Sequence, residues 1–246
     1  MKQIWSFFVS IGIVVLLSGC NADGKFALRS KMTGQFATAV ATTSTEKNGR
    51  YTIDIDIRTQ GLYNLLRGKR HEHYRSTGRI RKGLYYSYKL TIERWTDAKH
   101  LHSINAYTLD YKHRKITRHY REWHGKKKVE ESRVTMDYFA HDDFLTVLHN
   151  AWLDNHHKKT TRKTYYVAAS EETHGKVPVF FTRDPKFIKR WGAPKGGAIL
   201  QMGIHKGIFK NGKGSMTVLL DAQHRPVKFY LSNLETINTL IGVPIR

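Results

Sequence analysis

The sequence is poor in cysteine and in acidic residues. It has a single cysteine in 246 residues, so no intramolecular disulfide can form. Asp and Glu number 20 against 42 Lys and Arg, which gives a formal net charge of +22. Hydrophobic residues make up 40% of the chain and aromatic residues 12%, a composition that excludes an intrinsically disordered basic tail. We therefore expect a folded chain that builds its core without disulfides or metals.

The first 20 residues have the pattern of a bacterial lipoprotein signal peptide. An apolar run from Ile4 to Leu17 is about 14 residues long, which suits a signal peptide and is short of a permanent membrane span. Leu17, Ser18, Gly19 and Cys20 follow and resemble a lipobox. We expect residues 1–19 to be removed and the Cys20 thiol to carry lipid. The alternative is a free cysteine beside a buried apolar helix.

The N-terminal pattern also predicts where the protein resides. In the sorting pattern that this N-terminus resembles, Asn21 after Cys20 favours the outer membrane, where we expect a lipid-anchored protein on the periplasmic face. Residues 20–33 lack hydrophobic periodicity and are expected to form a tether. No repeat or linker divides the remainder, so residues 34–246 are predicted to be one antiparallel β domain.

Alternating hydrophobic residues predict many strands. Tyr51, Ile53, Ile55 and Ile57 alternate with polar residues, as in a strand with one buried face. Polar turn segments separate similar runs, which is typical of an antiparallel meander. Further strands are predicted at 73–80, 84–95, 101–111, 116–123, 129–136, 164–170, 177–182, 198–205, 215–221 and 227–234.

One amphipathic helix interrupts the strands. His141, Asp142 and Asp143 offer an N-cap, and an apolar stripe follows from Phe144 to Trp152. A short helical turn is predicted at 185–191. About ten strands exceed what an open sheet holds comfortably, so we expect a barrel or half-barrel covered by the helix.

Several segments together resemble an uncharacterised family of exported Gram-negative proteins. They are residues 59–68 (Thr-Gln-Gly-Leu-Tyr-Asn-Leu-Leu-Arg-Gly), 74–80, 134–138 leading into the helix, and 218–228. In order and spacing this set is similar to the domain of unknown function 3108 family. The resemblance implies a barrel-like antiparallel fold in the cell envelope and supplies no reaction. The strong basicity of this chain departs from the family pattern.

Basic residues concentrate in the turns of the predicted meander. Because alternate turns lie at the same end of a sheet, they would form a basic rim that attracts phospholipid or lipopolysaccharide phosphates. A solvated surface is the alternative, and nucleic acid is an unexpected partner outside the cytoplasm. The candidate anion-binding residues are Arg79, Arg81, Lys82, Lys112, Arg114, Lys115, Lys126, Lys127 and Lys128.

Apolar residues of two predicted strands are candidates to line the interior. They would surround either an ordinary packed core or a cavity for an acyl chain. We place them on shared inward faces: Tyr51, Ile53, Ile55, Ile57, Leu84, Tyr86, Tyr88 and Leu90.

No residue pattern indicates an enzyme. Asp142 and Asp143 are interpreted as helix caps, and the 14 histidines as surface residues without a metal site. Gly207, Gly212 and Lys213 follow the spacing of a phosphate loop but precede a predicted strand, so a hairpin turn is expected. The sequence thus predicts a non-catalytic lipoprotein, without cofactor, that binds or carries a lipid-like or amphipathic anion. The alternative is an assembly protein that docks on an acidic envelope protein or polymer, and a hydrolase ranks last.

Overall fold

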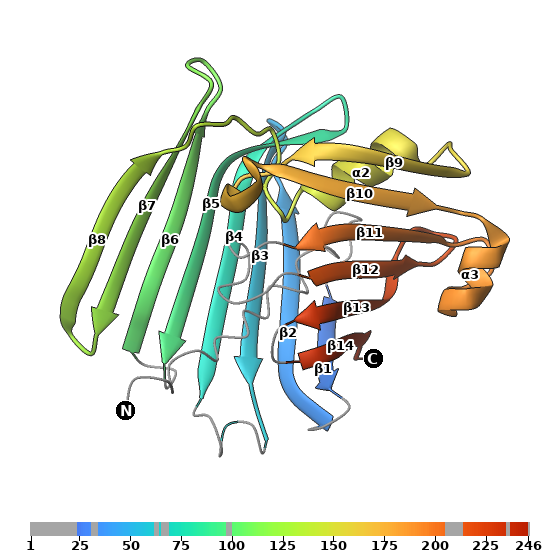
Figure 1. The fold of residues 1–246 in the computed structure, drawn as a ribbon, viewed down its shortest axis with the longest axis horizontal. Coiled ribbons are helices and arrows are strands. Elements are labelled where there is room, and N and C mark those ends of the chain that lie inside the picture. The colour runs from blue at the N-terminus through green and yellow to red at the C-terminus, as the bar shows by residue number, and fades with distance from the viewer. Residues whose placement is uncertain are drawn as a thin grey trace.

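The computed structural model describes residues 24–30, 34–61, 64, 69–96, 100–204, 214–234 and 237–245. This part forms one 14-stranded antiparallel sheet with helices α2 (Val147–Asn155) and α3 (Pro185–Trp191) and the 3-10 turn η3 (Glu171–Thr173) (Figure 1). The strands are β1 (Gly24–Ser30), β2 (Gly34–Thr45), β3 (Arg50–Thr59), β4 (Arg70–Arg81), β5 (Leu84–Thr96), β6 (His100–Asp110), β7 (Lys115–His124), β8 (Lys127–Thr135), β9 (Thr160–Tyr166), β10 (Lys176–Thr182), β11 (Ala198–Ile204), β12 (Gly214–Leu220), β13 (Pro226–Leu234) and β14 (Ile237–Pro244).

Two meanders share this sheet. Its order is β8 to β1 followed by β14 to β9, because β1 pairs with β14 and so joins the two runs. In Figure 1, strands β2 to β8 run steeply while β9 to β14 cross them, so the sheet curls. Helix α2 contacts both β5 and β10, between the two parts. The predicted curled antiparallel fold with a covering helix is confirmed.

Three strands were not predicted from the sequence: β1, β2 and β14. Residues Gly24–Ser30 were expected to belong to a tether, but they pair with β2 on one side and β14 on the other. Strand β2 turns Ala37, Ala39 and Ala41 inward, and these side chains are completely buried. Alanine has a low strand propensity, so the alternation in β2 gives a weak signal.

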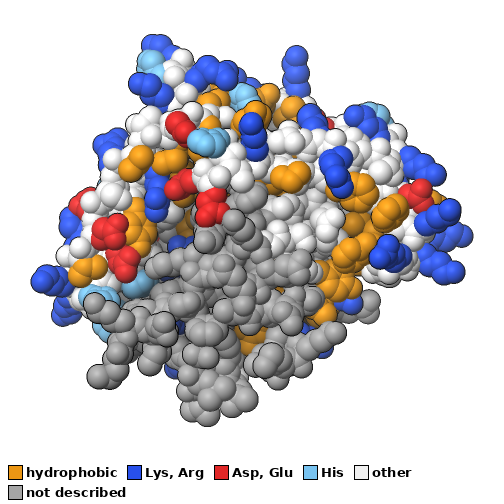
Figure 2. All heavy atoms as spheres, viewed as in Figure 1, with side chains coloured by type: hydrophobic (Ala, Val, Ile, Leu, Met, Phe, Trp, Pro, Cys, Tyr) orange, Lys and Arg blue, Asp and Glu red, His pale blue; other side chains and the backbone are white. Residues whose placement is uncertain are grey.

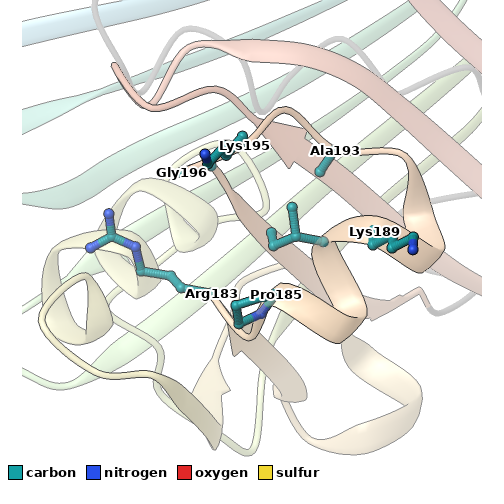
Figure 3. A pocket seen from close by; sticks show the side chains of 8 residues that line it. Arg183, Pro185, Lys189, Ala193, Lys195 and Gly196 are labelled. Carbon is teal, nitrogen blue, oxygen red and sulfur yellow. The ribbon is translucent and has the colours of Figure 1, made fainter.

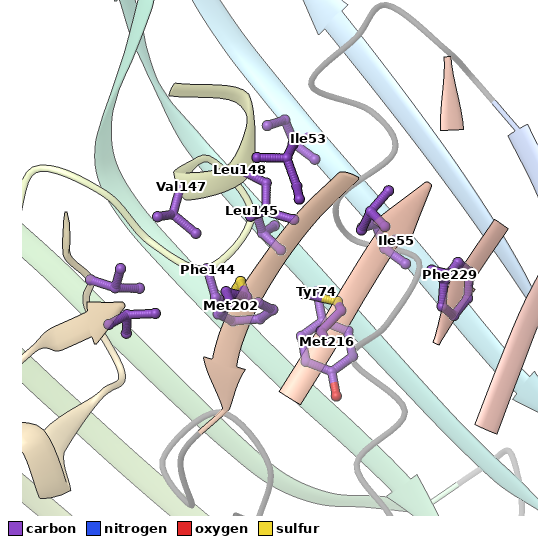
Figure 4. Packing of buried hydrophobic residues seen from close by; sticks show 14 of the residues in the cluster. Ile53, Ile55, Tyr74, Phe144, Leu145, Val147, Leu148, Met202, Met216 and Phe229 are labelled. Atoms are coloured by element: carbon purple, nitrogen blue, oxygen red, sulfur yellow. The ribbon is translucent and has the colours of Figure 1, made fainter. Parts of the chain in front are cut away.

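Side chains from the two parts of the sheet pack together in one buried cluster. Ile53 and Ile55 of β3 belong to one buried cluster with Met202 of β11 and Met216 of β12 (Figure 4). Phe144 enters from the segment before α2, and its ring meets the edge of Tyr74 at a centroid distance of 5.6 Å. The residues that were predicted to line an interior therefore include part of the main hydrophobic core.

A β-bulge corrects the predicted face of β5. Thr77 pairs with Lys89 and Gly78 with Ser87, so Tyr88 is an extra residue in this ladder. The bulge shifts the alternation by one position. Leu90 remains buried as expected, whereas Leu84, Tyr86 and Tyr88 are only partly buried and alternate with the buried Tyr85 and Ser87.

Helix α2 starts later than the sequence pattern suggests. Asp143 does act as a cap, since its Oδ1 accepts the backbone N–H groups of Leu145 (2.7 Å) and Thr146 (3.1 Å). These residues form a turn, and the helix itself begins at Val147. Helix α3 has the predicted bounds because Asp184 caps its first turn and Gly192 ends it with a φ of 66°.

Gly242 of β14 allows a close contact across the sheet. It pairs with Phe229 of β13, and a Cβ atom at position 242 would lie 1.7 Å from the Phe229 ring. We expect Gly242→Ala to lower the free energy of unfolding by about 1 to 3 kcal/mol, because the buried ring must move. Urea denaturation would measure this loss. Adding Phe229→Leu should restore part of it, and a neutral Gly242→Ala variant would contradict the prediction.

Candidate functional site

Two hairpin turns bring basic residues to the same end of the sheet. The β4–β5 turn carries Arg81 and Lys82, and the β6–β7 turn carries Lys112 and Arg114, with Lys115 at the start of β7. Both turns lie along the upper edge of Figure 1. Lys82 has a φ of 51° and the next residue, Gly83, a φ of 82°, as in the tight turns that match strand twist.

Aromatic rings fill the space beside these turns. Tyr111 lies at the centre, with ring centroids 6.1 Å from Tyr86, 5.5 Å from Tyr88 and 5.3 Å from Phe139. The ring of His141 lies 5.7 Å from Tyr111, whose hydroxyl donates to the His141 carbonyl at 3.0 Å. The segment between β8 and α2 thus completes a cluster that strand β5 and the β6–β7 turn begin.

The cations of the turns lie over these rings. The Arg81 guanidinium is 5.9 Å from the centroid of Tyr86, and that of Arg114 is 5.3 Å from Phe139. We call this surface the basic–aromatic rim. It comprises the cations Arg81, Lys82, Lys112, Arg114 and Lys115 and the rings of Tyr86, Tyr88, Tyr111, Phe139 and His141.

Acidic side chains do not neutralise the rim. Within the described residues, none of its five cations forms an ion pair with a carboxylate. The nearby carboxylate of Asp110 is occupied by His113, at 2.6 Å. Burial, and then the charge of Arg114, lower the pKa of His141, so that ring is neutral at pH 7. Figure 2 shows Lys and Arg side chains gathered with hydrophobic ones along this upper edge.

The other predicted basic residues are divided by the fold. Arg79 is partly buried on β4 near the rim. In the strand register it lies opposite Arg50 of β3 and Tyr86 of β5. Lys126 lies in the β7–β8 turn and Lys127 and Lys128 begin β8, at the opposite end of the sheet. Lys128 forms an ion pair with Glu131 there. The turn positions in the sequence therefore predict the basic part of the rim, whereas Tyr111, Phe139 and His141 join it only through folding.

A buried pair of carboxylates holds the segment behind the rim. Besides the two N–H groups, Asp143 accepts the hydroxyls of Ser76 (2.5 Å) and Ser87 (2.7 Å) through Oδ2. Asp142 Oδ1 accepts the side-chain amide of Asn150 at 2.5 Å. Burial raises the pKa of Asp142 to about 7 and also raises the pKa of Asp143. These contacts fix the chain that presents Phe139 and His141, and they are structural.

Within the described residues, the other sequence patterns do not assemble into a second site. His71 contacts Asp56, and His73 contacts Asp54 at 2.7 Å, so both imidazoles serve as partners of carboxylates. No group of three metal-ligating side chains occurs in the described part of the chain. Among the helices described, none is both long and apolar enough to cross a bilayer. Cys20 and the phosphate-loop pattern at Gly207, Gly212 and Lys213 lie outside the described residues.

Comparisons with known proteins place the fold in a class. No protein-family model and no curated protein matches the sequence, so the resemblance to the domain of unknown function 3108 family stays a prediction. Among solved structures, the chain is similar to a β-barrel-like protein, the domain of unknown function DUF1849 from Brucella abortus. The two share 10% sequence identity and a TM-score of 0.52 over 91% of this chain and 94% of that one. This similarity supports a barrel-like fold alone.

Proposed function

We propose that this protein is a non-catalytic lipoprotein of the cell envelope, anchored to the outer membrane through Cys20, whose basic–aromatic rim binds an anionic amphipathic molecule. The ligand class is a lipid or lipopolysaccharide headgroup that carries phosphate. The observation behind the proposal is the meeting of five cations without carboxylate partners and five aromatic rings at one end of the sheet.

The chemistry of the rim suits a surface that is charged on the outside and apolar beneath. Lys and Arg attract phosphate groups of anionic lipids. Tyrosine and phenylalanine rings are favoured where one side is wet and the other apolar, as at the level of lipid headgroups. Arg81 and Arg114 lie over rings that hold them near the surface, which reduces the side-chain entropy lost on binding.

The described interior supports binding at the surface over carriage inside the sheet. Tyr51, Ile53, Ile55 and Ile57 are almost completely buried against other side chains of the core. This packing also favours the second candidate, an assembly protein that docks through a basic face on an acidic partner. The two candidates differ in whether lipid alone is sufficient for binding.

Removing rim charges should weaken binding to anionic vesicles. We expect the triple variant Arg81→Gln, Lys112→Gln, Arg114→Gln to lose at least tenfold in affinity for phosphatidylglycerol vesicles, because each basic residue adds to attraction at the surface. Cosedimentation of the chain from residue 21 onward, which contains every described element, would measure this. Binding should also fall as salt rises from about 0.05 to 0.5 M.

A matched control separates a specific rim from net charge. The variant Lys126→Gln, Lys127→Gln, Lys128→Gln removes the same charge at the opposite end and should change affinity less than twofold. Equal losses in the two variants would contradict a site at the rim. A wild-type chain that binds neither anionic vesicles nor lipopolysaccharide would contradict lipid binding and favour an acidic protein partner.

A further inference from the structure

A second, separate feature lies around α3, on the outer face of the sheet. Ile188 of α3 packs on Ile199 of β11 and Leu219 of β12 in a small buried cluster distinct from the main core. The rings of Trp191 and Tyr230, 5.7 Å apart, cover its edge. Because both ends of α3 are capped and its inner side is buried, the helix is held firmly in place.

A cavity of about 510 Å³ opens beside α3. This volume lies within the range of small-molecule sites. Its lining is mostly apolar, with Pro185, Ile188 and Ala193 beside the backbone of Gly196 and Gly197 (Figure 3). A Cβ atom at position 197 would lie 2.0 Å from the carbonyl oxygen of Leu220, so glycine is required for this wall.

Three cations line the cavity, and none of the described residues that line it is acidic. They are Arg183, Lys189 and Lys195, which Figure 3 shows on different sides of the opening. The nearest carboxylate in sequence, Asp184, is engaged by the backbone N–H of Lys186 (2.9 Å) and by Lys159 (3.2 Å). In the described part of the chain, Lys189 and Lys195 form no ion pair, and Arg183 donates one N–H to the carbonyl of His156 at 2.9 Å.

We propose that this cavity binds a small amphiphilic anion, with a carboxylate or phosphate monoester head on an alkyl chain. The apolar floor would bury the alkyl part, and the three cations would hold the head. Arg183 is suited to both head groups because guanidinium pairs with carboxylate and phosphate oxygens in a fixed planar geometry. The site is independent of the rim, since it uses other residues on a different part of the sheet.

Isothermal titration calorimetry with matched probes tests the ligand class. We expect decanoate or decyl phosphate to bind, with the stronger of the two identifying the head group. Acetate and inorganic phosphate lack the chain, and decanol lacks the charge, so each should bind at least tenfold more weakly. The proposal would be overturned if decanol bound as tightly as the anionic probes, or if neither decanoate nor decyl phosphate bound.

Two pairs of substitutions on the same helix region locate the site. Lys189→Gln with Lys195→Gln should weaken binding of the anionic probe at least tenfold. Lys186→Gln with Arg190→Gln removes the same charge from α3 at positions outside the cavity lining and should leave binding unchanged. Equal losses in both variants would overturn the assignment. The rim variant should retain full affinity for the probe, which keeps this test separate from that of vesicle binding.

Discussion

Asp143→Ala is expected to destabilise the protein by about 3 to 5 kcal/mol. Four donors lose their acceptor together: the hydroxyls of Ser76 and Ser87 and the backbone N–H groups of Leu145 and Thr146. Asp143 and Ser87 are completely buried, so water cannot replace the lost carboxylate without opening the structure. Buried polar groups left without partners cost about 1 to 3 kcal/mol each, although neighbouring losses do not add fully.

Asp143→Asn is the matched comparison. The amide keeps one oxygen for the backbone N–H groups, and the serine hydroxyls can rotate to accept its N–H. We expect it to lose about half as much stability as the alanine variant. Urea denaturation of the three proteins measures the free energies of unfolding. A loss below about 1 kcal/mol in Asp143→Ala would show that the carboxylate does not hold this segment.

Asp142→Asn is expected to stabilise the protein at high pH by up to about 4 kcal/mol. Burial raises the pKa of Asp142 from its ordinary value of 3.8 to about 7. The unfolded chain therefore releases this proton near pH 4, while the folded protein keeps it until pH 7. Over that interval the free energy of unfolding of the wild type falls by about 1.4 kcal/mol per pH unit. The asparagine variant has no carboxyl group at this position and avoids that loss.

The pH dependence distinguishes this effect from a change in packing. Denaturation midpoints of wild type and Asp142→Asn should coincide near pH 3.5 and separate progressively up to pH 8. Asparagine retains the oxygen that accepts the Asn150 amide, so the contact between α2 and β5 through Asn150 and Tyr85 is preserved. Asp110→Asn is a control in which stability should depend on pH in the opposite direction. Because His113 lowers the pKa of Asp110, the wild type should gain stability relative to this variant as the pH rises. If the denaturation midpoints of wild type and Asp142→Asn differed by the same amount at every pH, the prediction would be refuted.

Sequence periodicity was sufficient for the strands with large side chains. Strand β3 alternates isoleucine with polar residues, and its side chains are buried as the pattern predicts. Strand β2 contributes alanines to the same core, which leaves little hydrophobic contrast to detect. The bulge at Tyr88 depends on pairing between two strands, so the sequence of β5 alone could not reveal that Tyr86 and Tyr88 leave the inward face.

The candidate site was predictable only in part, for a similar reason. Alternate turns of a meander must lie at one end, so the proximity of Arg81 and Arg114 follows from strand order. The approach of Phe139 and His141 depends on how the chain returns over the sheet after β8, which the buried Asp143 determines. The α3 cavity likewise arises from a tertiary contact between α3 and β11, and no local motif marks it.

The position of β1 limits how the protein can move at a membrane. The strand begins at Gly24, four positions after Cys20, and four residues span at most about 14 Å. With Cys20 as the proposed anchor, the sheet can tilt and rotate but cannot leave the bilayer surface. Any headgroup ligand would then be met by two-dimensional diffusion at a high effective concentration. A headgroup that binds only weakly to the protein in solution would therefore occupy its site almost continuously when the protein is anchored at the membrane.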